Sequence, residues 1–318
     1  MISSFMDYQA LTQEIEAQYR INIVKLQLHR AMIGQVYFIQ AQSGKYVFKL
    51  YRSFNTANAI QSTEILKYLR QNNYPAAIMV PAINGELNIA IDTPEGLSIG
   101  ILYNFVEGVE PDGDIEIVQL GVQTGALHKL MEGYPYPLIN HTKETYIGGF
   151  ISIMNRMEYD PSKTADLMKY GDELWARIYR LPKGFCHGDL HTGNMLRQGS
   201  SGIYVLFDFD DASGDYPMMD IAYMSDDTHF NVFDEGAYDA TLRKFGRFYQ
   251  GYAEQRTVQE AEIQAITDFV AVRHYQIIAR IVGCKGLQEI SHGFLDEQYV
   301  WLMNWNNLCE KKRSSLAQ

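Results

Sequence analysis

Apolar and polar residues alternate along the first part of the chain, in two short runs at Val24, Leu26 and Leu28 and at Val36 and Phe38. Successive side chains of a strand point to opposite faces, so a period of two predicts half-buried strands. After the Ser43-Gly44 turn, residues 45–51 form a third run of the same kind. We therefore expect three antiparallel strands that follow one another as a meander.

Two helices are predicted in the same region. One lies around Thr12 to Tyr19, with Thr12 as its N-cap, and the other runs from Asn55 to Gln71. The second helix has a largely apolar stripe at Ser62, Ile65, Leu66 and Leu69. Beyond it the strand pattern returns, over 78–83, 87–91 and 97–105. The N-terminal part thus predicts a small antiparallel sheet with one packed helix.

From Ile115 onward the apolar residues recur with helical spacing, as in the predicted helices 260–282 and 295–311. One short strand, 204–209, interrupts this pattern. Strands confined to one part of a chain and helices to the other are typical of the α+β class. We expect a bilobal protein in which residues 1–105 form a sheet-containing lobe and residues 106–318 a mainly helical one.

Length and composition agree with two lobes. The chain has 318 residues, 47% of them hydrophobic and 20% charged, which is close to globular averages. It contains no apolar run of the roughly 20 residues that cross a bilayer, and its first ten residues lack the pattern of a signal peptide. These features predict a cytoplasmic protein without a membrane partner.

The formal net charge is −11. Such a charge repels nucleic-acid backbones and anionic membrane surfaces, and it attracts cationic small molecules. The three cysteines, Cys186, Cys284 and Cys309, show no C-x-x-C pair and are predicted to be buried thiols. The composition therefore disfavours a nucleic-acid partner, a disulfide framework and a zinc site, while the oligomeric state stays open.

The strongest chemical signal is His187-Gly188-Asp189, followed by Asn194 and, after an apolar strand, by Asp208-Phe209-Asp210. Transfer of a γ-phosphoryl group needs a carboxylate that accepts the proton of the attacking hydroxyl and oxygen ligands that hold Mg²⁺. Mg²⁺ takes few protein ligands, so one amide and one carboxylate suffice. The spacing predicts a phosphotransferase.

The stretch from Phe185 to Ala222 resembles the aminoglycoside phosphotransferase and choline kinase superfamily, whose members share the protein-kinase fold. Gly188 stands where protein kinases have arginine, which separates the small-molecule kinases from the H-R-D pattern. The resemblance implies that Asp189 is the catalytic base, that Asn194 and Asp208 bind Mg²⁺, and that Asp220 braces the catalytic loop. His187 is expected to hold the shape of that loop.

The N-terminal part is then expected to bind the nucleotide, ATP or GTP. In the third strand Val47 and Lys49 point to the same face, and Lys49 matches the kinase lysine that contacts the α- and β-phosphates. Glu64 is the only acidic residue between Asn55 and Gln71 and is the candidate partner of Lys49. However, Glu64 lies opposite the apolar stripe of its helix, so the pairing is left open.

Two further segments complete the expected nucleotide site. Gly34 is the only glycine of the first hairpin loop, and backbone amides from Ile33 to Gln35 are candidates to cradle phosphate. The segment 101–108 resembles the interlobe hinge of the family, where backbone groups of Asn104, Phe105 and Val106 are expected to read the adenine edge.

The acceptor is the least determined part. Candidates are an aminoglycoside, an amino alcohol or a hydroxyamino acid, and acidic residues after the metal motif favour a cationic molecule. Two other functions remain open: a Ser/Thr protein kinase and a non-catalytic nucleotide-binding protein. Gly188 and the short gap between Asp208 and Asp220 disfavour the first, and the intact set of Lys49, Asp189, Asn194 and Asp208 disfavours the second.

Overall fold

The computed structural model describes residues 7–31, 34–199 and 202–316. The chain forms two compact units. The first comprises Met1–Pro111 and Gly193–Ala212, and the second comprises Asp112–Thr192 and Ser213–Gln318. The α+β class predicted from the sequence is confirmed, because an antiparallel sheet and a set of helices occupy different units.

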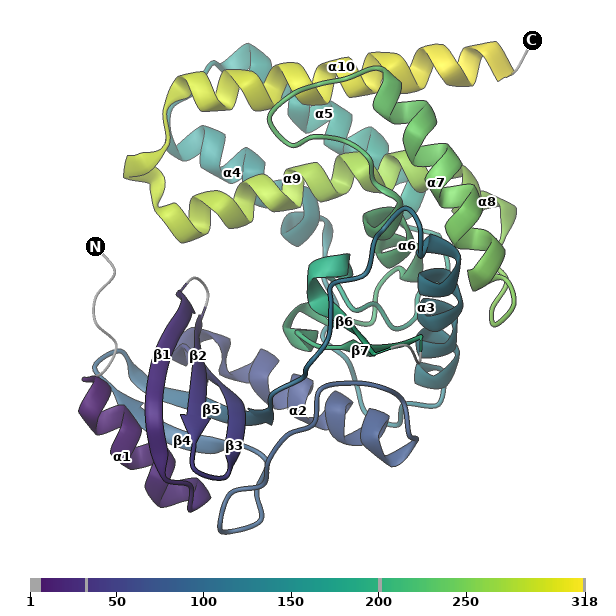
Figure 1. Cartoon of the computed structure of the whole chain (residues 1–318). Helices are drawn as coiled ribbons and strands as arrows, with labels where there is room; N and C mark the ends of the chain where they lie inside the picture. The colour runs from purple at the N-terminus through teal and green to yellow at the C-terminus, as the bar shows by residue number, and fades with distance from the viewer. Residues whose placement is uncertain (1–6, 32–33, 200–201, 317–318) are drawn as a thin grey trace. The chain divides into compact units, whose positions relative to one another are not determined.

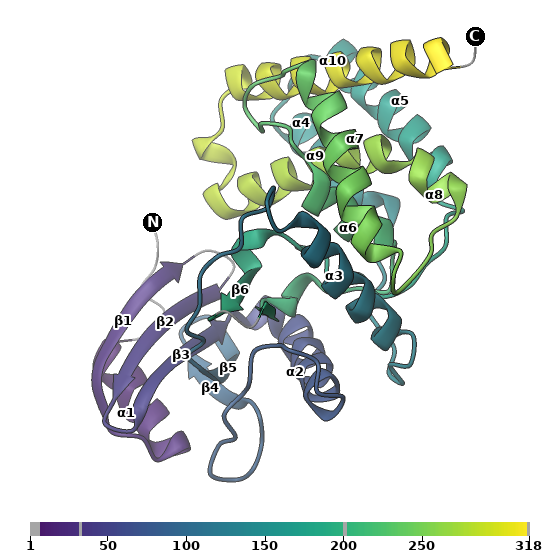
Figure 2. The same cartoon turned by 45° about the vertical axis from the view of Figure 1, so that its right-hand side comes forward.

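A five-stranded antiparallel sheet forms the first unit, in the order β1 (Ile23–Ala31), β2 (Gly34–Ala41), β3 (Gly44–Tyr51), β5 (Gly96–Asn104), β4 (Ile89–Thr93) (Figures 1 and 2). The predicted meander of three strands is therefore confirmed. Alternation along β3 sends Phe48 and Leu50 into the core, whereas Val47 and Lys49 face a cavity on the opposite side. This two-sided sheet provides one wall of the candidate site.

Helix α1 (Tyr8–Tyr19) covers the core face of the sheet through Leu11, Ile15 and Tyr19. Thr12 was predicted as its N-cap, and this was wrong. The cap is Asp7, whose carboxylate accepts a 3.3 Å hydrogen bond from the Ala10 amide. The helix begins one turn earlier than expected, because Asp is a stronger capping residue than Thr.

The predicted strand over 78–83 is also wrong. Val80 N–H donates to Leu102 O, and the Asn104 amide donates to Ile78 O, so the segment runs beside β5 without joining the sheet as a strand. Pro81 has no N–H to donate, which stops the hydrogen-bond ladder after these contacts. Helix α2 (Thr56–Gln71) agrees with its prediction, and its buried side includes Ile65, Leu66 and Leu69.

Residues 193–212 return to the first unit as a hairpin of β6 (Met195–Gln198) and β7 (Ile203–Leu206), followed by the 3₁₀ turn η4 (Phe209–Asp211). The predicted single strand 204–209 is thus shorter and has a partner. Backbone hydrogen bonds fix the hairpin to the unit: the Ala77 amide donates to Leu206 O, and the Val109 amide donates to Arg197 O. This return places Asn194 and Asp208 in the same unit as Lys49.

The second unit contains the helices α3 (Ile117–Met131), α4 (Gly149–Arg156), α5 (Pro161–Ile178), α6 (Pro217–Ser225), α7 (Gly236–Tyr252), α8 (Glu260–Gln264), α9 (Ile266–Lys285) and α10 (His292–Leu316). The predicted helix 260–282 is therefore two helices that meet at Ala265. Within this unit α9 packs against α4, α5, α6 and α10 (Figure 1). None of the helices, in the part of the chain that the structure describes, has the length and apolar character of a membrane span.

Close packing of α3 on α7 depends on glycine. A Cβ at Gly121 would lie 2.0 Å from Phe248 O, and one at Gly251 would lie 1.9 Å from Val118 O. Of the cysteines, Cys186 and Cys309 are buried as predicted. Cys284 is exposed, which corrects the third prediction, because it lies in the last turn of α9 beyond the packed core.

Candidate active site

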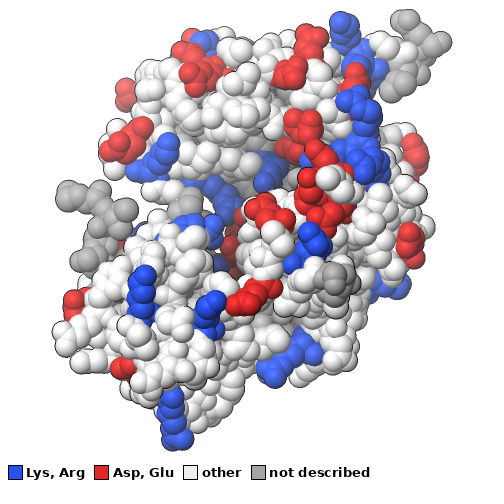
Figure 3. Space-filling model, in the orientation of Figure 1, with Lys and Arg blue, Asp and Glu red and all other residues white. Residues whose placement is uncertain are grey.

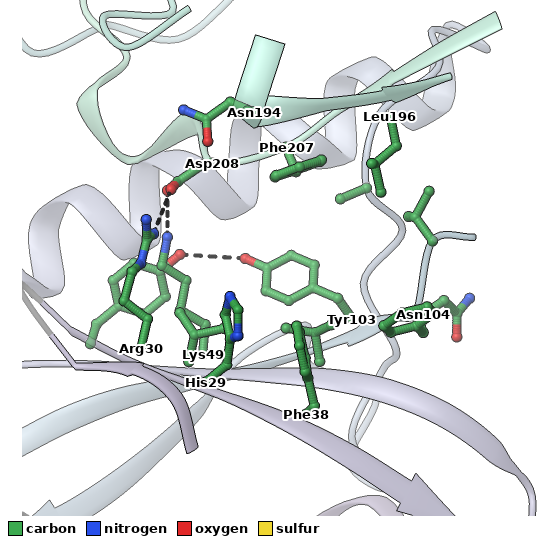
Figure 4. A pocket seen from close by; sticks show the side chains of 17 residues that line it. His29, Arg30, Phe38, Lys49, Tyr103, Asn104, Asn194, Leu196, Phe207 and Asp208 are labelled. Carbon is green, nitrogen blue, oxygen red and sulfur yellow. Dashed lines mark hydrogen bonds and ion pairs between the residues drawn. The ribbon is translucent and has the colours of Figure 1, made fainter. Parts of the chain in front are cut away.

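A cavity of about 320 Å³ lies within the first unit, and Figure 4 shows the side chains that line it. One wall is the open face of the sheet, and another is the segment 193–208, which contains the β6–β7 hairpin. Apolar side chains line most of it: Val36, Phe38, Val47, Ala77, Tyr103, Phe105, Val106, Leu196 and Phe207. Charged side chains gather at one end, where Arg30, Lys49 and Asp208 lie with Asn194 beside them, whereas His29 stacks on Phe38 and Asn104 lies at the other end (Figure 4). A molecule with a flat apolar part and a charged part matches this division.

Lys49 lies at the polar end, between two carboxylates. Its Nζ is 2.5 Å from Asp208 Oδ1 and 2.6 Å from Asp210 Oδ2. Burial alone lowers the pKa of an ammonium group, but the two carboxylates outweigh it and raise the pKa of Lys49 above its ordinary value. Lys49 is therefore a permanent cation.

Asp208 has the left-handed backbone conformation, with φ 66° and ψ 54°. This conformation is unfavourable for a residue other than glycine and concentrates at functional sites. It turns the carboxylate toward Lys49 and toward Arg30, whose Nη2 lies 3.2 Å from Asp208 Oδ2. Lys49 and Arg30 thus hold the carboxylate of Asp208 in the cavity. Asp208 is the residue that the sequence predicts as a metal ligand.

Asp210 is a second carboxylate in the same place. Burial raises the pKa of Asp210 to about 6, the charge of Asp208 acts in the same direction, and Lys49 opposes both. The Tyr51 hydroxyl donates a 2.8 Å hydrogen bond to its Oδ1. The side chain of Asp210 thus faces both Lys49 and Tyr51.

Helix α2 holds the backbone of this acidic turn. Asn58 Nδ2 donates to Asp210 O at 2.8 Å, and Gln61 Nε2 donates to Ala212 O at 2.6 Å. Sequence reasoning missed both residues, since it searched this helix for a charged partner of Lys49. The spacing of three residues, which places two amide side chains on one face, was the available signal.

Glu64 does not pair with Lys49. Its carboxylate lies 3.6 Å from Lys67 Nζ on the same helix, and the side chains of Glu64 and Lys67 are 38% and 48% exposed. Lys49 forms ion pairs with Asp208 and Asp210 instead. Glu64 is thereby corrected as a cofactor-binding residue, and the reason is its position away from the buried face of α2.

Gly34 begins β2 and lies close to its neighbouring strand. A Cβ at this position would be 2.8 Å from Leu50 O, so the site requires glycine. Of the predicted phosphate-cradling residues, Ile33 lies outside the described part of the chain, and Gln35 is buried, where its amide oxygen accepts a hydrogen bond from the Tyr37 hydroxyl.

The predicted hinge residues are Asn104, which ends β5, and the two residues after it. The Asn104 amide donates to Ile78 O, and the Phe105 amide donates to Lys45 O at 3.3 Å. Within the described part of the chain, the Val106 amide donates to no protein acceptor. All three residues line the cavity, and Val106 adds a backbone donor beside its apolar walls.

Residues 187–192, with Asp189, belong to the second unit. Asp189 is partly exposed, with 22% of its side-chain surface accessible. Its Oδ1 lies 3.9 Å from Arg273 Nη2 and 3.8 Å from Arg280 Nη1, and its Oδ2 lies 3.9 Å from His191 Nε2. Sequence reasoning missed both arginines, which come from α9, far along the chain.

Asp220 braces this loop from α6. It is fully buried and accepts hydrogen bonds from the amides of His187 at 2.6 Å and Gly188 at 3.0 Å. His128 Nε2 lies 3.0 Å from its Oδ2. Gly188 has φ 83°, which lets the chain bend so that both amides reach one carboxylate. His187 is itself fully buried, in accord with a structural role.

With this geometry established, comparison with known proteins decides the family. Residues 26–257, well over half of the chain, match the model of the phosphotransferase enzyme family. The chain belongs to this family. The predicted family and the predicted enzyme class, a small-molecule kinase, are therefore confirmed.

Individual relatives of this phosphotransferase are distant. Amicoumacin kinase of Bacillus subtilis strain 168 is 24% identical over 293 residues, which span 86% of this chain and 84% of the relative. A solved amicoumacin kinase, hAmiN, in complex with AMP-PNP, Ca²⁺ and Ami superposes with a TM-score of 0.75 at 20% identity, covering 96% of this chain and 94% of the other. The structure of a microcompartment-associated aminopropanol kinase superposes with a TM-score of 0.75 at 18% identity, covering 97% of this chain and 98% of the other. At these identities the superpositions show a shared fold.

The residues of this phosphotransferase fit a divalent metal ion. Asn194 is buried and lies next to Asp208 in the cavity (Figure 4), so an amide oxygen and a carboxylate oxygen face the same space. Across the described segments no group of three His, Cys, Asp or Glu side chains is arranged as a metal site. Mg²⁺ does not need one, since it binds through one or two protein oxygens together with phosphates and water.

Proposed function

We propose that this protein transfers the γ-phosphoryl group of ATP or GTP to a hydroxyl group of a small molecule, with Mg²⁺ as cofactor. The observation that supports this most is the position of Lys49, whose Nζ lies 2.5 Å from Asp208 at the charged end of an otherwise apolar cavity. A purine base suits the apolar walls, and a phosphate chain suits the charged end. The roles of the individual residues follow from this division.

A bound magnesium nucleotide supplies the phosphorus atom and the leaving group of the reaction. The residues of the cavity bind and orient it. Val36 and Val47 cover one side of the base, Leu196 and Phe207 the other, and the Val106 amide offers a donor to its edge. Asn194 and Asp208 are the oxygen ligands for Mg²⁺. Lys49 neutralises phosphate oxygens, and its permanent charge is what this role requires.

In the second unit Asp189 accepts the proton of the attacking hydroxyl. Asp220 holds the loop by its amides, so that the carboxylate of Asp189 keeps one orientation. In this assignment residues 1–105 form the nucleotide-binding lobe, to which the 193–212 segment adds Asn194 and Asp208. Residues 106–318 otherwise supply catalysis and acceptor binding.

A small acceptor agrees with the length of the segment after Asp208. The turn η4 ends at Asp211 and α6 begins at Pro217, so only residues 212–216 lie between them. A platform that presents a peptide to the catalytic loop needs a longer segment. The relatives named above act on amicoumacin and aminopropanol, and aminoglycosides, amino alcohols and hydroxyamino acids are the acceptor classes to test first.

The test is release of ADP or GDP with each acceptor of such a panel, in the presence and absence of Mg²⁺. We expect Mg²⁺-dependent phosphorylation of at least one small hydroxyl compound and no phosphorylation of a generic protein. Nucleotide binding is measured separately as a rise in melting temperature. Absence of both turnover and nucleotide binding would overturn the proposed function.

Asp189→Asn tests the assignment of the base. The amide keeps the size of the side chain but cannot accept the proton, so we expect kcat to fall by about 10²-fold or more while nucleotide binding persists. Asp92→Asn, at an exposed position of β4, is the matched control and is expected to keep full activity. Undiminished activity of Asp189→Asn would remove Asp189 from the mechanism.

A further inference from the structure

Asp210 lies beside the nucleotide cavity in the turn η4, two residues after Asp208, and the proposed chemistry gives it no role. Both oxygens of its carboxylate are engaged. Oδ2 lies 2.6 Å from Lys49 Nζ, and Oδ1 accepts a 2.8 Å hydrogen bond from the Tyr51 hydroxyl. Lys49 and Tyr51 are two residues apart in β3, so their side chains lie on the same face of the strand. A cation and a hydroxyl group of one strand thus fix the orientation of this carboxylate.

Helix α2 fixes the backbone of the same turn. Asn58 Nδ2 donates to the carbonyl oxygen of Asp210 at 2.8 Å, and Gln61 Nε2 donates to that of Ala212 at 2.6 Å. The two amides lie three residues apart on a regular helix, so they hold the turn from one rigid element. Asp210 is therefore fixed at its backbone and at its side chain, which is what a residue needs to orient a neighbouring group.

Lys49 contacts two carboxylates that differ in their other partners. Asp208 also lies 3.2 Å from Arg30, and in the proposed function it binds Mg²⁺. Asp210 contacts Tyr51 instead. A carboxylate that binds a divalent cation gives up much of its attraction for an ammonium group, because the two cations repel each other. Asp210 is then the carboxylate that stays with Lys49.

Lys49 is not a surface lysine. Figure 3 shows lysine and arginine side chains that project from the surface into solvent, whereas the side chain of Lys49 is only 13% exposed. That of Asp210 is 16% exposed. A buried ammonium group without a carboxylate has lost its hydration and has nothing to fix its flexible four-carbon chain. The position of the Lys49 ammonium group therefore depends on its carboxylate partners.

We infer that Asp210 is a positioning residue that acts through Lys49: it holds the ammonium group toward the phosphates of the nucleotide, while Asp208 binds Mg²⁺. The inference rests on the proposed function, since Lys49 meets phosphates only if the cavity binds a nucleotide. Asp210 then has the task for which the sequence offered Glu64, which contacts Lys67 instead. Helix α2 contributes to this task through its two amides, which hold the turn, and not through a carboxylate.

The test is a double-mutant cycle of Asp210→Asn, Lys49→Met and the variant that carries both changes. The rate constant kcat is measured with ATP and the acceptor of the panel that gives the fastest turnover. We expect Asp210→Asn to lower kcat by about tenfold, because a displaced ammonium group is misplaced for the transition state. In the Lys49→Met background the same change is expected to lower kcat by less than about twofold, since residues that act as a unit are not additive.

Nucleotide affinity separates positioning from metal binding. It is measured by calorimetry with the non-hydrolysable analogue AMP-PNP at several Mg²⁺ concentrations. Asp210→Asn is expected to bind the analogue within about threefold of wild type, because a residue that orients a group for the transition state affects kcat more than binding. The Mg²⁺ concentration that half-saturates this binding is expected to stay the same, since Asn194 and Asp208 keep their oxygens.

Tyr51→Phe is a second variant that leaves both charges in place. It removes the hydroxyl that holds Oδ1 of Asp210, and kcat is expected to fall by about threefold, the effect of one hydrogen bond. If Asp210→Asn does not fold, Tyr51→Phe completes the same cycle with Lys49→Met. Asp92→Asn, at an exposed position of β4, is the matched control and is expected to keep kcat. Melting temperatures show which variants are folded.

A full further loss of kcat from Asp210→Asn in the Lys49→Met background would overturn the inference, because Asp210 would then act without the lysine. So would an unchanged kcat in Asp210→Asn, or a severalfold higher Mg²⁺ requirement for AMP-PNP binding, which indicates a metal ligand. The proposed function has a separate readout, which is nucleotide binding and Mg²⁺-dependent phosphorylation by the wild type. An additive cycle in an active enzyme would remove Asp210 as a positioning residue and leave the phosphotransferase intact.

Discussion

The carboxylate of Asp220 accepts a 2.6 Å hydrogen bond from the backbone amide of His187. Both residues are fully buried, and the same carboxylate also receives the Gly188 amide and His128 Nε2. Burial raises the pKa of a carboxyl group, but these hydrogen bonds and the nearby histidines outweigh it and hold the pKa of Asp220 below its usual value. The shape of the catalytic loop therefore depends on one buried charge.

Asp220→Asn removes that charge at nearly constant volume. One amide oxygen cannot accept all of these hydrogen bonds, so we expect the free energy of unfolding to fall by about 1–3 kcal/mol. Because the pKa of Asp220 is depressed in the folded state, its contribution is present above the unfolded pKa of about 4 and is lost as the pH falls below it. Urea unfolding at pH 7 and at pH 3.5 checks this: a stability difference between wild type and variant that does not shrink at the lower pH contradicts it.

Lys49→Met tests the cation of the nucleotide cavity. It leaves Asp208 and Asp210 facing each other without Lys49 between them, and a bound phosphate chain loses its main cationic contact. We expect kcat/KM for the nucleotide to fall by about 10²–10³-fold, the range for the loss of one preorganised electrostatic group. Steady-state kinetics and calorimetric nucleotide titration measure this, and a loss below tenfold in both would remove Lys49 from the phosphate site.

The period of two along β2 and β3 was enough to predict the sheet and the side on which Lys49 lies, because alternation follows from strand geometry alone. The family resemblance was enough to predict that Asp220 braces the loop, whose amides it accepts, and the role of Asp189 as base stays a prediction. The predicted strand over 78–83 was wrong because apolar alternation does not reveal that Pro81 breaks the ladder.

The pattern of apolar and polar residues did not predict contacts between segments that are far apart in the sequence. Asn58 and Gln61 of α2 hold the turn that contains Asp210, some 150 positions later in the chain. Arg273 and Arg280 of α9, which lie near Asp189, come more than 80 residues after it in the chain. Periodicity shows which face of a helix is polar, but the element that faces it depends on packing.

Glu64→Gln tests the correction to the predicted lysine–glutamate pair. Because Glu64 contacts Lys67 in a solvent-exposed i,i+3 pair, its loss is expected to change the free energy of unfolding by less than about 0.5 kcal/mol. For the same reason kcat/KM is expected to change by less than about twofold. Kinetics run beside Lys49→Met decide the point, since losses of similar size in the two variants would mean that Glu64 pairs with Lys49 during turnover.

Asp210→Asn is expected to alter the pH dependence of stability. Burial raises the pKa of Asp210 to about 6, well above its value in the unfolded chain. A raised carboxyl pKa means that its stabilising contribution is full below pH 4, where the group is neutral in both states, and is lost as the pH rises through 6. The asparagine is neutral throughout, so the stability of wild type relative to the variant should decline between pH 4 and pH 7. Thermal unfolding across that range measures the decline, with Asp92→Asn as the control, whose stability relative to wild type should show no such trend around pH 6. A flat difference for Asp210→Asn would mean that Lys49 keeps Asp210 ionised throughout this range.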